Sequence, residues 1–270
     1  MLFIVNGTGP WGESYESDMA TSFCKQIEKL GGGKYFRGPT TFGLQTYLIS
    51  DAIVTGIKEK MAKGDSSPVF LVGHSRGGAA VIRAAQLLKT ERIDVKVKAM
   101  FLFDAVDRTL NRSVNVQMVP GNVVTCYHAM RDRKFREHLG NDVAKALADW
   151  NSNSKIAPAS PATRLKGTAY SDLCHKDMMF RRFSRCENIT EFEYYSLDFG
   201  NCGLSAEAPC KMVPHDLFYC THGAVGGAPE PEAKHKVREL AEEDNKAQDK
   251  VRTWIFKSML QEGALQPGGM

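Results

Sequence analysis

The sequence predicts an α/β protein with a mostly parallel central sheet and helices on both faces. Short apolar runs rich in Val, Phe and Ile recur along the chain, at 2–5, 68–73, 97–104 and 122–130. Segments long enough for helices separate most of these runs. Continuous apolar runs are typical of strands that are buried on both faces, as the strands of parallel sheets are.

The segments between these runs show the spacing of amphipathic helices. Residues 16–32 place apolar side chains near helical spacing and end at glycines, which favour helix termination. Residues 44–62 and 78–91 predict two further helices. The other expected elements are extended segments at 34–43, 190–200 and 215–220 and a charged helix over 230–262, followed by a frayed tail.

The length and composition indicate a single globular domain over residues 1–270. A chain of 270 residues with 43% hydrophobic and 24% charged residues can bury a sizeable core that needs no disulfide or structural metal for stability. Neither an internal repeat nor a clear linker is visible. The regular pattern degrades between 139 and 190, where 151–167 form a polar loop containing Pro and Ser. Loops of this length are commonly lids or binding insertions, so we expect a cap or lid at 139–190.

The charge pattern argues against a nucleic-acid-binding protein. The net charge is only +4, and acidic residues interrupt or follow the basic runs. A nucleic-acid footprint needs one larger basic surface. We therefore expect the basic runs to be solvated faces; they comprise Arg131, Arg133, Lys134 and Arg136, and then Arg181, Arg182 and Arg185.

Motifs for metals, cofactors and membrane spans are missing from the sequence. The seven cysteines contain no CxxC pair and no four-ligand zinc spacing, and no phosphate loop or dinucleotide fingerprint occurs. We expect reduced thiols and no metal or cofactor, although one or two disulfides are conceivable among the five later cysteines. No signal peptide or membrane span is evident, which favours a cytoplasmic protein or one exported by a route independent of a signal peptide.

The stretch "VFLVGHSRGGAA" (69–80) contains a G-x-S-x-G motif between an expected strand and an expected helix. A serine at the tip of such a turn is strained and needs small neighbours, which Gly73 and Gly77 provide on either side of His74 and Ser75. The N–H of Arg76, at the start of the helix, would be one oxyanion donor. A glycine-rich turn without a nucleophile is the alternative, but both flanks favour a nucleophile.

A hydrolase of this type carries its acid and its histidine later in the chain. Asp104 ends the apolar run at 97–104, although either Asp104 or Asp107 would also suit a turn cap. Asp132, after the next strand, is a rival acid. Among the seven histidines, His222 is the best placed, because it opens a glycine-rich loop after an expected strand.

Several separated segments resemble the α/β-hydrolase domain of the type VI secretion lipase effectors and their uncharacterised relatives. The ordered set covers about residues 2 to 230 and is more specific than any one segment. It consists of "VNGTGP" (5–10), "YFRGPTTFG" (35–43), "GHSRGGAAVIRAA" (73–85), "LFDAVDR" (102–108), "CYHAMRDRKFREHL" (126–139) and "CTHGAVGGAP" (220–229).

The resemblance implies an α/β-hydrolase fold with Ser75 as nucleophile, Asp104 as acid and His222 as base. It also implies that Gly7 or Thr8 lines the oxyanion side. The expected function is hydrolysis of carboxylic esters through an acyl-enzyme, with lipid or phospholipid acyl esters as substrates.

The sequence departs from the family pattern at two positions. Asn6 stands where an aspartate is usual in the first loop, and Ala224 replaces the aspartate that follows the family's histidine. These changes would alter how the loop is held in place or which substrate is bound, and they leave all three triad residues present. His128 would be a structural or site-edge residue rather than the base.

Other functions fit the same residues. A soluble short-chain esterase is the nearest rival, and a peptidase would use the same triad. A non-catalytic binding module would keep the serine turn for packing and use 131–136 for a partner. A lipid substrate would bring the protein to a membrane surface, and the resemblance leaves open an inhibitory protein partner.

Overall fold

A computed structural model describes residues 1–8, 14–39, 45–107, 116–131, 201–213, 217–218, 220–228 and 241–267. Several expectations fall on other residues. They are the insertion at 139–190, the strand at 190–200, the rival acid Asp132, the basic residues after Arg131, and the 230–240 part of the charged helix.

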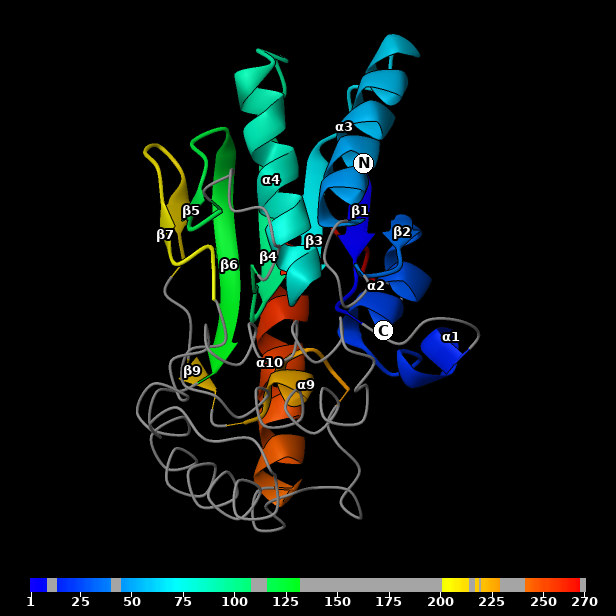
Figure 1. Ribbon diagram of the computed structural model, residues 1–270, viewed down its shortest axis with the longest axis vertical. Helices are drawn as coiled ribbons and strands as arrows, with labels where there is room; N and C mark the ends of the chain where they lie inside the picture. Colours follow the sequence, from blue (N-terminus) through cyan, green and yellow to red (C-terminus); the bar gives the residue numbers. More distant parts are fainter. Residues whose placement is uncertain are drawn as a thin grey trace, which may run out of the picture.

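A parallel sheet forms the centre of the molecule, in the order β2-β1-β3-β4-β6-β8 (Figure 1). Strand β9 also pairs with β6, beyond the residues that β8 contacts, and all these pairings are parallel. Strands β5 and β7 form a separate parallel pair. The bounds are β1 Leu2–Val5, β2 Lys34–Phe36, β3 Val69–His74, β4 Val97–Phe103, β5 Met118–Val119, β6 Val123–Arg131, β7 Ser205–Ala206, β8 Lys211–Met212 and β9 Leu217–Phe218.

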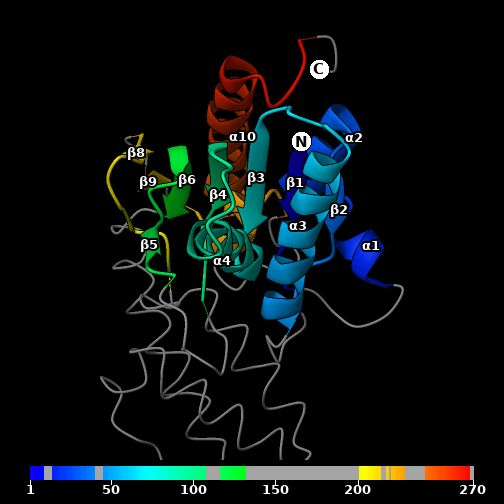
Figure 2. The same ribbon diagram turned by 90° about the horizontal axis from the view of Figure 1, so that it is seen from above.

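Helices cover both faces of this sheet (Figure 2). Alternate strand residues point to opposite faces, so Leu71 packs with α3 and α4 while its neighbours Phe70 and Val72 pack with α2 and α10. The predicted α/β class with helices on both faces is therefore confirmed. The helices are α1 Ser14–Asp18, α2 Phe23–Gly31, α3 Gln45–Ala62, α4 Arg76–Thr90, α9 His222–Val225 and α10 Ala241–Glu262.

The order of the strands creates a switch point between β1 and β3. From β1 the chain passes through α2 to β2 on one side, whereas from β3 it passes through α4 to β4 on the other. Loops that leave neighbouring parallel strands in opposite directions open a crevice at the carboxyl ends of those strands. Residues just after β1 and β3 are therefore placed where open α/β sheets bind ligands.

Most elements follow the sequence pattern, but the helix expected at 16–32 is two helices. Ser22 caps α2 because its hydroxyl accepts a hydrogen bond from the Lys25 N–H, at 3.3 Å. The predicted stop is confirmed at Gly32, which has the left-handed conformation that glycine adopts without strain.

The expectation of a frayed tail is wrong for the first residues after α10. Gly263 has a φ of 78°, which turns the chain back, and the Ala264 N–H donates to the Met259 carbonyl. Leu265 is only 3% exposed and lies with Leu2 against Gly31. Apolar contact with the opposite end of the chain, which local sequence does not reveal, orders this segment.

Among the described residues, none of the helices combines the length and the apolar character needed to cross a membrane.

We expect Leu265→Ala to lower the free energy of unfolding by about 2–4 kcal/mol, because it removes buried methyl groups and leaves a cavity. The matched control is Leu204→Ala, since Leu204 is 50% exposed; this change should cost less than about 0.5 kcal/mol. Urea unfolding at pH 7.5 measures both. Equal effects would contradict an ordered tail.

Candidate active site

Ser75 lies between β3 and α4 in a backbone conformation that is rare outside glycine. Its φ is 54° and its ψ is −127°. The Ser75 N–H donates to the Phe103 carbonyl at 3.0 Å, and the Ser75 carbonyl accepts from the N–H groups of Gly78 and Val106. Such strain persists only where surrounding contacts enforce it, and here these bonds also fix Ser75 against the chain that flanks Asp104.

Glycines around Ser75 allow backbone segments to approach each other. A Cβ at Gly73 would lie 2.6 Å from the Gly77 carbonyl oxygen, and one at Gly77 would lie 2.4 Å from the Val5 carbonyl oxygen. A Cβ at Gly78 would lie 2.4 Å from the Ala105 Cβ. The predicted need for glycine on both sides of Ser75 therefore has a specific steric cause.

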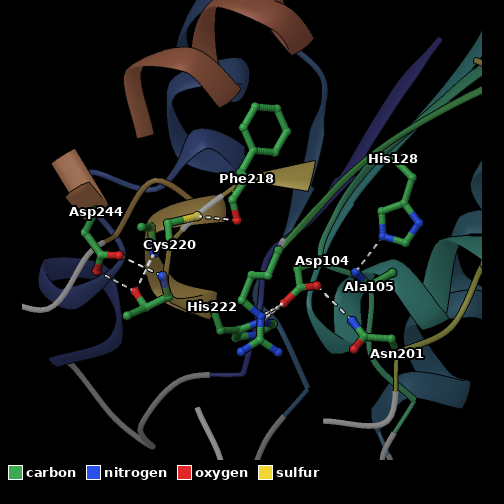
Figure 3. Close-up of polar contacts among 11 residues, drawn as sticks. Asp104, Ala105, His128, Asn201, Phe218, Cys220, His222 and Asp244 are labelled. Carbon is green, nitrogen blue, oxygen red and sulfur yellow. Dashed lines mark hydrogen bonds and ion pairs between the residues drawn. The ribbon is translucent and has the colours of Figure 1, made fainter. Parts of the chain in front are cut away.

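The Asp104 carboxylate accepts hydrogen bonds from three other segments (Figure 3). Its Oδ2 accepts from His222 Nδ1–H at 2.6 Å and from Arg131 Nε–H at 2.7 Å. Its Oδ1 accepts from Asn201 Nδ2 at 2.8 Å. The residue is 1% exposed and has a φ of 40°.

These partners determine the charge of Asp104. Burial by itself raises the pKa of a carboxyl group. The charge of Arg131 and the hydrogen bond from His222 outweigh burial here and lower the pKa of Asp104 well below its usual range. Asp104 is therefore an ionised carboxylate inside the protein.

His222 begins a short helical turn rather than the flexible glycine-rich loop expected there. Thr221 caps α9, and its side-chain oxygen accepts from the Ala224 N–H. The N–H and hydroxyl of Thr221 donate to the two carboxylate oxygens of Asp244 in α10, at 2.7 and 2.6 Å. This attachment to α10 holds His222, which is 3% exposed, against Asp104.

His74 lies beside His222, with the ring centroids 5.1 Å apart. Its ring fits between two glycines, because a Cβ at Gly7 or at Gly226 would come within 2.6 or 2.3 Å of ring atoms. Burial is the main cause that lowers the pKa of His74 to about 3, and the neighbouring imidazole of His222 adds to the effect. His74 is therefore neutral near pH 7.

The loop after β1 is fixed by the side chain of Asn6. Asn6 Oδ1 accepts from the Gly7 N–H at 2.8 Å, and Asn6 Nδ2 donates to Ser22 Oγ and to the Tyr35 hydroxyl. An ionised aspartate has no amide hydrogen to donate to these two hydroxyls. The Gly7 N–H already donates to Asn6, so of the two residues expected to line the oxyanion side, Thr8 is the better candidate for the donor.

His128 is completely buried and connects two turns. Its Nε2 accepts from the Ala105 N–H at 3.0 Å, so its Nδ1, 3.1 Å from the Gly203 carbonyl oxygen, is the donor. These contacts support the interpretation of His128 as a structural residue, because both ring nitrogens hold backbone groups.

Two partners of Asp104 were not found by sequence reasoning. Arg131 was expected on a solvated face; that expectation is wrong, because its side chain is 1% exposed and ion-paired with Asp104. Its position at the end of an apolar strand was the available signal. Asn201, which forms a bridge with Val106, had no recognisable signal.

No group of three or more His, Cys, Asp or Glu side chains within the described ranges could hold a metal ion. The cysteines in those ranges, Cys24, Cys126, Cys202, Cys210 and Cys220, are free thiols.

No protein-family model matches this chain, and no curated protein matches its sequence significantly.

We expect Gly77→Ala to destabilise the fold by at least about 2 kcal/mol, because the new methyl group would meet backbone atoms that cannot move aside. The control is Gly56→Ala in α3, whose added Cβ would meet a Phe3 ring atom at 3.1 Å. Alanine favours a helix interior, so this control should stay within about 1 kcal/mol of wild type. Denaturant unfolding compares them, and similar losses would contradict the steric argument.

His74 should make stability depend on pH. Its folded pKa of about 3 lies below its ordinary value of 6.5, so the unfolded chain binds a proton that the folded protein does not. This contribution is complete above pH 6.5 and is lost as the pH falls toward 3. From pH 7.5 to pH 5 the loss is about 2 kcal/mol.

The measurement is the free energy of unfolding of wild type and His74→Leu across this range. The variant should lose less stability than wild type over the same interval, whatever its stability at pH 7.5. Parallel curves would contradict a neutral, buried His74.

Proposed function

We propose that this protein is a serine hydrolase that cleaves carboxylic esters through an acyl-enzyme. One observation carries the proposal: a buried hydrogen bond of 2.6 Å joins His222 to an ionised Asp104 beside the strained Ser75 turn. Ser75 would be the nucleophile, His222 the general base and Asp104 the acid of the triad.

The hydrogen bond assigns the two imidazole nitrogens different roles. Because Nδ1 of His222 donates to Asp104, Nε2 is the nitrogen that would take the Ser75 hydroxyl proton. Ser75 would then attack the ester carbonyl, and the imidazolium would return its proton to the leaving alcohol. Water, activated by His222, would attack the acyl-enzyme and release the acid.

The oxyanion of each tetrahedral intermediate would form at the start of α4. This helix begins at Arg76, immediately after the nucleophile, and its N-terminal end attracts negative charge. The Arg76 N–H is the first proposed donor. The second would come from Thr8 in the loop after β1, across the switch point.

The order of strands and the position of Ser75 also support an α/β-hydrolase fold. In that fold the nucleophile follows a central parallel strand and the second oxyanion donor comes from the loop of a neighbouring strand. Here β3 lies between β1 and β4, so the loops after these three strands meet around Ser75.

A non-catalytic binding module explains the site less well. A turn that serves only packing does not need a buried, ionised carboxylate hydrogen-bonded to an imidazole, and such perturbed groups concentrate at functional sites. For the substrate, the sequence resemblance favours lipid or phospholipid acyl esters over short-chain esters and peptides.

The test is labelling by a fluorophosphonate probe, which reacts with activated serines. Wild type should be labelled, Ser75→Ala should not, and His222→Ala should be labelled at least about 10³-fold more slowly. The control Ser67→Ala removes an exposed serine outside the site and should label like wild type. Absence of labelling in folded wild type would reject the hydrolase and favour the binding module.

Substrate class is then separated with p-nitrophenyl esters of increasing chain length and with a p-nitroanilide peptide. Turnover that rises with chain length supports a lipase-like enzyme. Preference for acetate or butyrate would indicate a soluble esterase, and anilide cleavage would indicate a peptidase.

A further inference from the structure

One oxygen of Asp104 receives hydrogen bonds from two different basic side chains. Arg131 Nε and His222 Nδ1 both donate to Oδ2, at 2.7 and 2.6 Å. The side chains of Arg131 and Asp104 are each 1% exposed, so water screens this ion pair poorly. The guanidinium is thus a permanent positive charge inside the proposed site.

This arrangement changes what the carboxylate can do for His222. In a Ser-His-Asp triad the negative acid stabilises the imidazolium that forms when the histidine takes a proton. Here Arg131 already balances the charge of Asp104. An imidazolium at His222 would share the oxygen Oδ2 with the guanidinium, and two like charges on one acceptor atom are close enough to disfavour protonation.

Strand pairing fixes Arg131 in this position. Arg131 is the last residue of β6, and its backbone pairs with Phe218 of β9, a few residues before His222. Asn201 holds the other oxygen of Asp104. The carboxylate is therefore oriented from both sides, and Arg131 supplies the charge as well as a donor.

We propose, on the basis of the hydrolase function above, that Arg131 is a positioning residue that orients Asp104 and keeps His222 unprotonated in mildly acidic solution. The imidazole would then remain a proton acceptor, and Ser75 reactive, at a pH where a triad without this guanidinium loses its base.

Other charged or titratable groups of the described residues face this site from several elements. His74 from β3 is neutral near pH 7, and His128 from β6 holds backbone groups. Asp244 from α10 binds Thr221, next to His222, and the buried thiols of Cys202 and Cys220 interact electrostatically with Asp104. All of these groups are unchanged in variants of Arg131, so a comparison of these variants isolates the guanidinium.

The first test follows the protonation of His222 directly by NMR titration of labelled histidine, with His222→Asn to assign the signal. Arg131→Gln keeps a donor near Asp104 but removes the charge, and Arg131→Met removes both. In each, the titration midpoint of His222 should rise by at least about one pH unit. Arg131→Lys keeps the charge and should stay within about half a unit of wild type.

An unchanged midpoint in a folded neutral variant would overturn the proposal. The wild-type protein provides a second criterion that does not depend on how the variants fold. If His222 of wild type is already protonated at pH 7, the guanidinium does not have the proposed effect.

The second test measures the rate of fluorophosphonate labelling against pH. For each protein, the labelling rate at pH 5.5 is divided by its own rate at pH 8. This ratio should be at least about tenfold lower for Arg131→Gln than for wild type, and the ratio for Arg131→Lys should match that of wild type. A shifted midpoint without labelling of wild type at any pH would reject the hydrolase function only. Normal labelling with equal pH profiles would reject the role of Arg131 only.

Discussion

The ionised carboxylate of Asp104 is the constraint on which the rest of the site depends. A buried charge is costly unless donors surround it, and this one accepts hydrogen bonds from His222, Arg131 and Asn201. These partners come from α9, from β6 and from the chain before β7, so segments far apart in the sequence must converge for the carboxylate to be stable. The hydrogen bonds that stabilise the Asp104 carboxylate therefore also bring the parts of the site together.

The strained backbone at Ser75 is the second constraint, and it is coupled to the first. The Ser75 N–H and carbonyl bind the residues on either side of Asp104 and Ala105, at Phe103 and Val106. His128 holds the same turn through the Ala105 N–H. The Ser75 turn and the Asp104 turn are thus one hydrogen-bonded unit at the carboxyl edge of the sheet, which fixes their relative position without any bound ligand.

Local sequence was enough to predict the longer strands β1, β3, β4 and β6 and to single out the three candidate triad residues, but it did not predict the two-residue strands β5, β7 and β8. Ser75 and Asp104 stand at the ends of apolar runs, and His222 begins a glycine-rich segment, so their positions follow from local pattern. The roles of Arg131 and Asn201 depend on which strands become neighbours, which no local window contains. Arg131 was placed in a basic run, although pairing of β6 with β4 buries it against Asp104.

The same reasoning explains why the helix at 16–32 and the tail differed from expectation. Apolar spacing continues across Thr21 and Ser22, but the capping hydroxyl of Ser22 starts a new helix there. The tail after Gly263 looks polar and glycine-rich, yet Leu265 finds a partner in Leu2 at the other end of the chain. In both cases a specific contact outweighed the local sequence pattern.

The charges around His222 also explain how protonation of this histidine can cost more free energy in the resting protein than during the proposed reaction. In the resting state, protonation of His222 would add a positive charge next to Arg131 without any new anion. In the proposed reaction, the imidazolium forms together with an oxyanion at the start of α4, where the helix end favours negative charge. The new anion offsets the new cation, so Arg131 penalises the protonated resting protein more than the tetrahedral intermediate. A guanidinium beside the acid can therefore disfavour protonation of the histidine by solvent more strongly than it disfavours proton transfer from the serine to the histidine during the reaction.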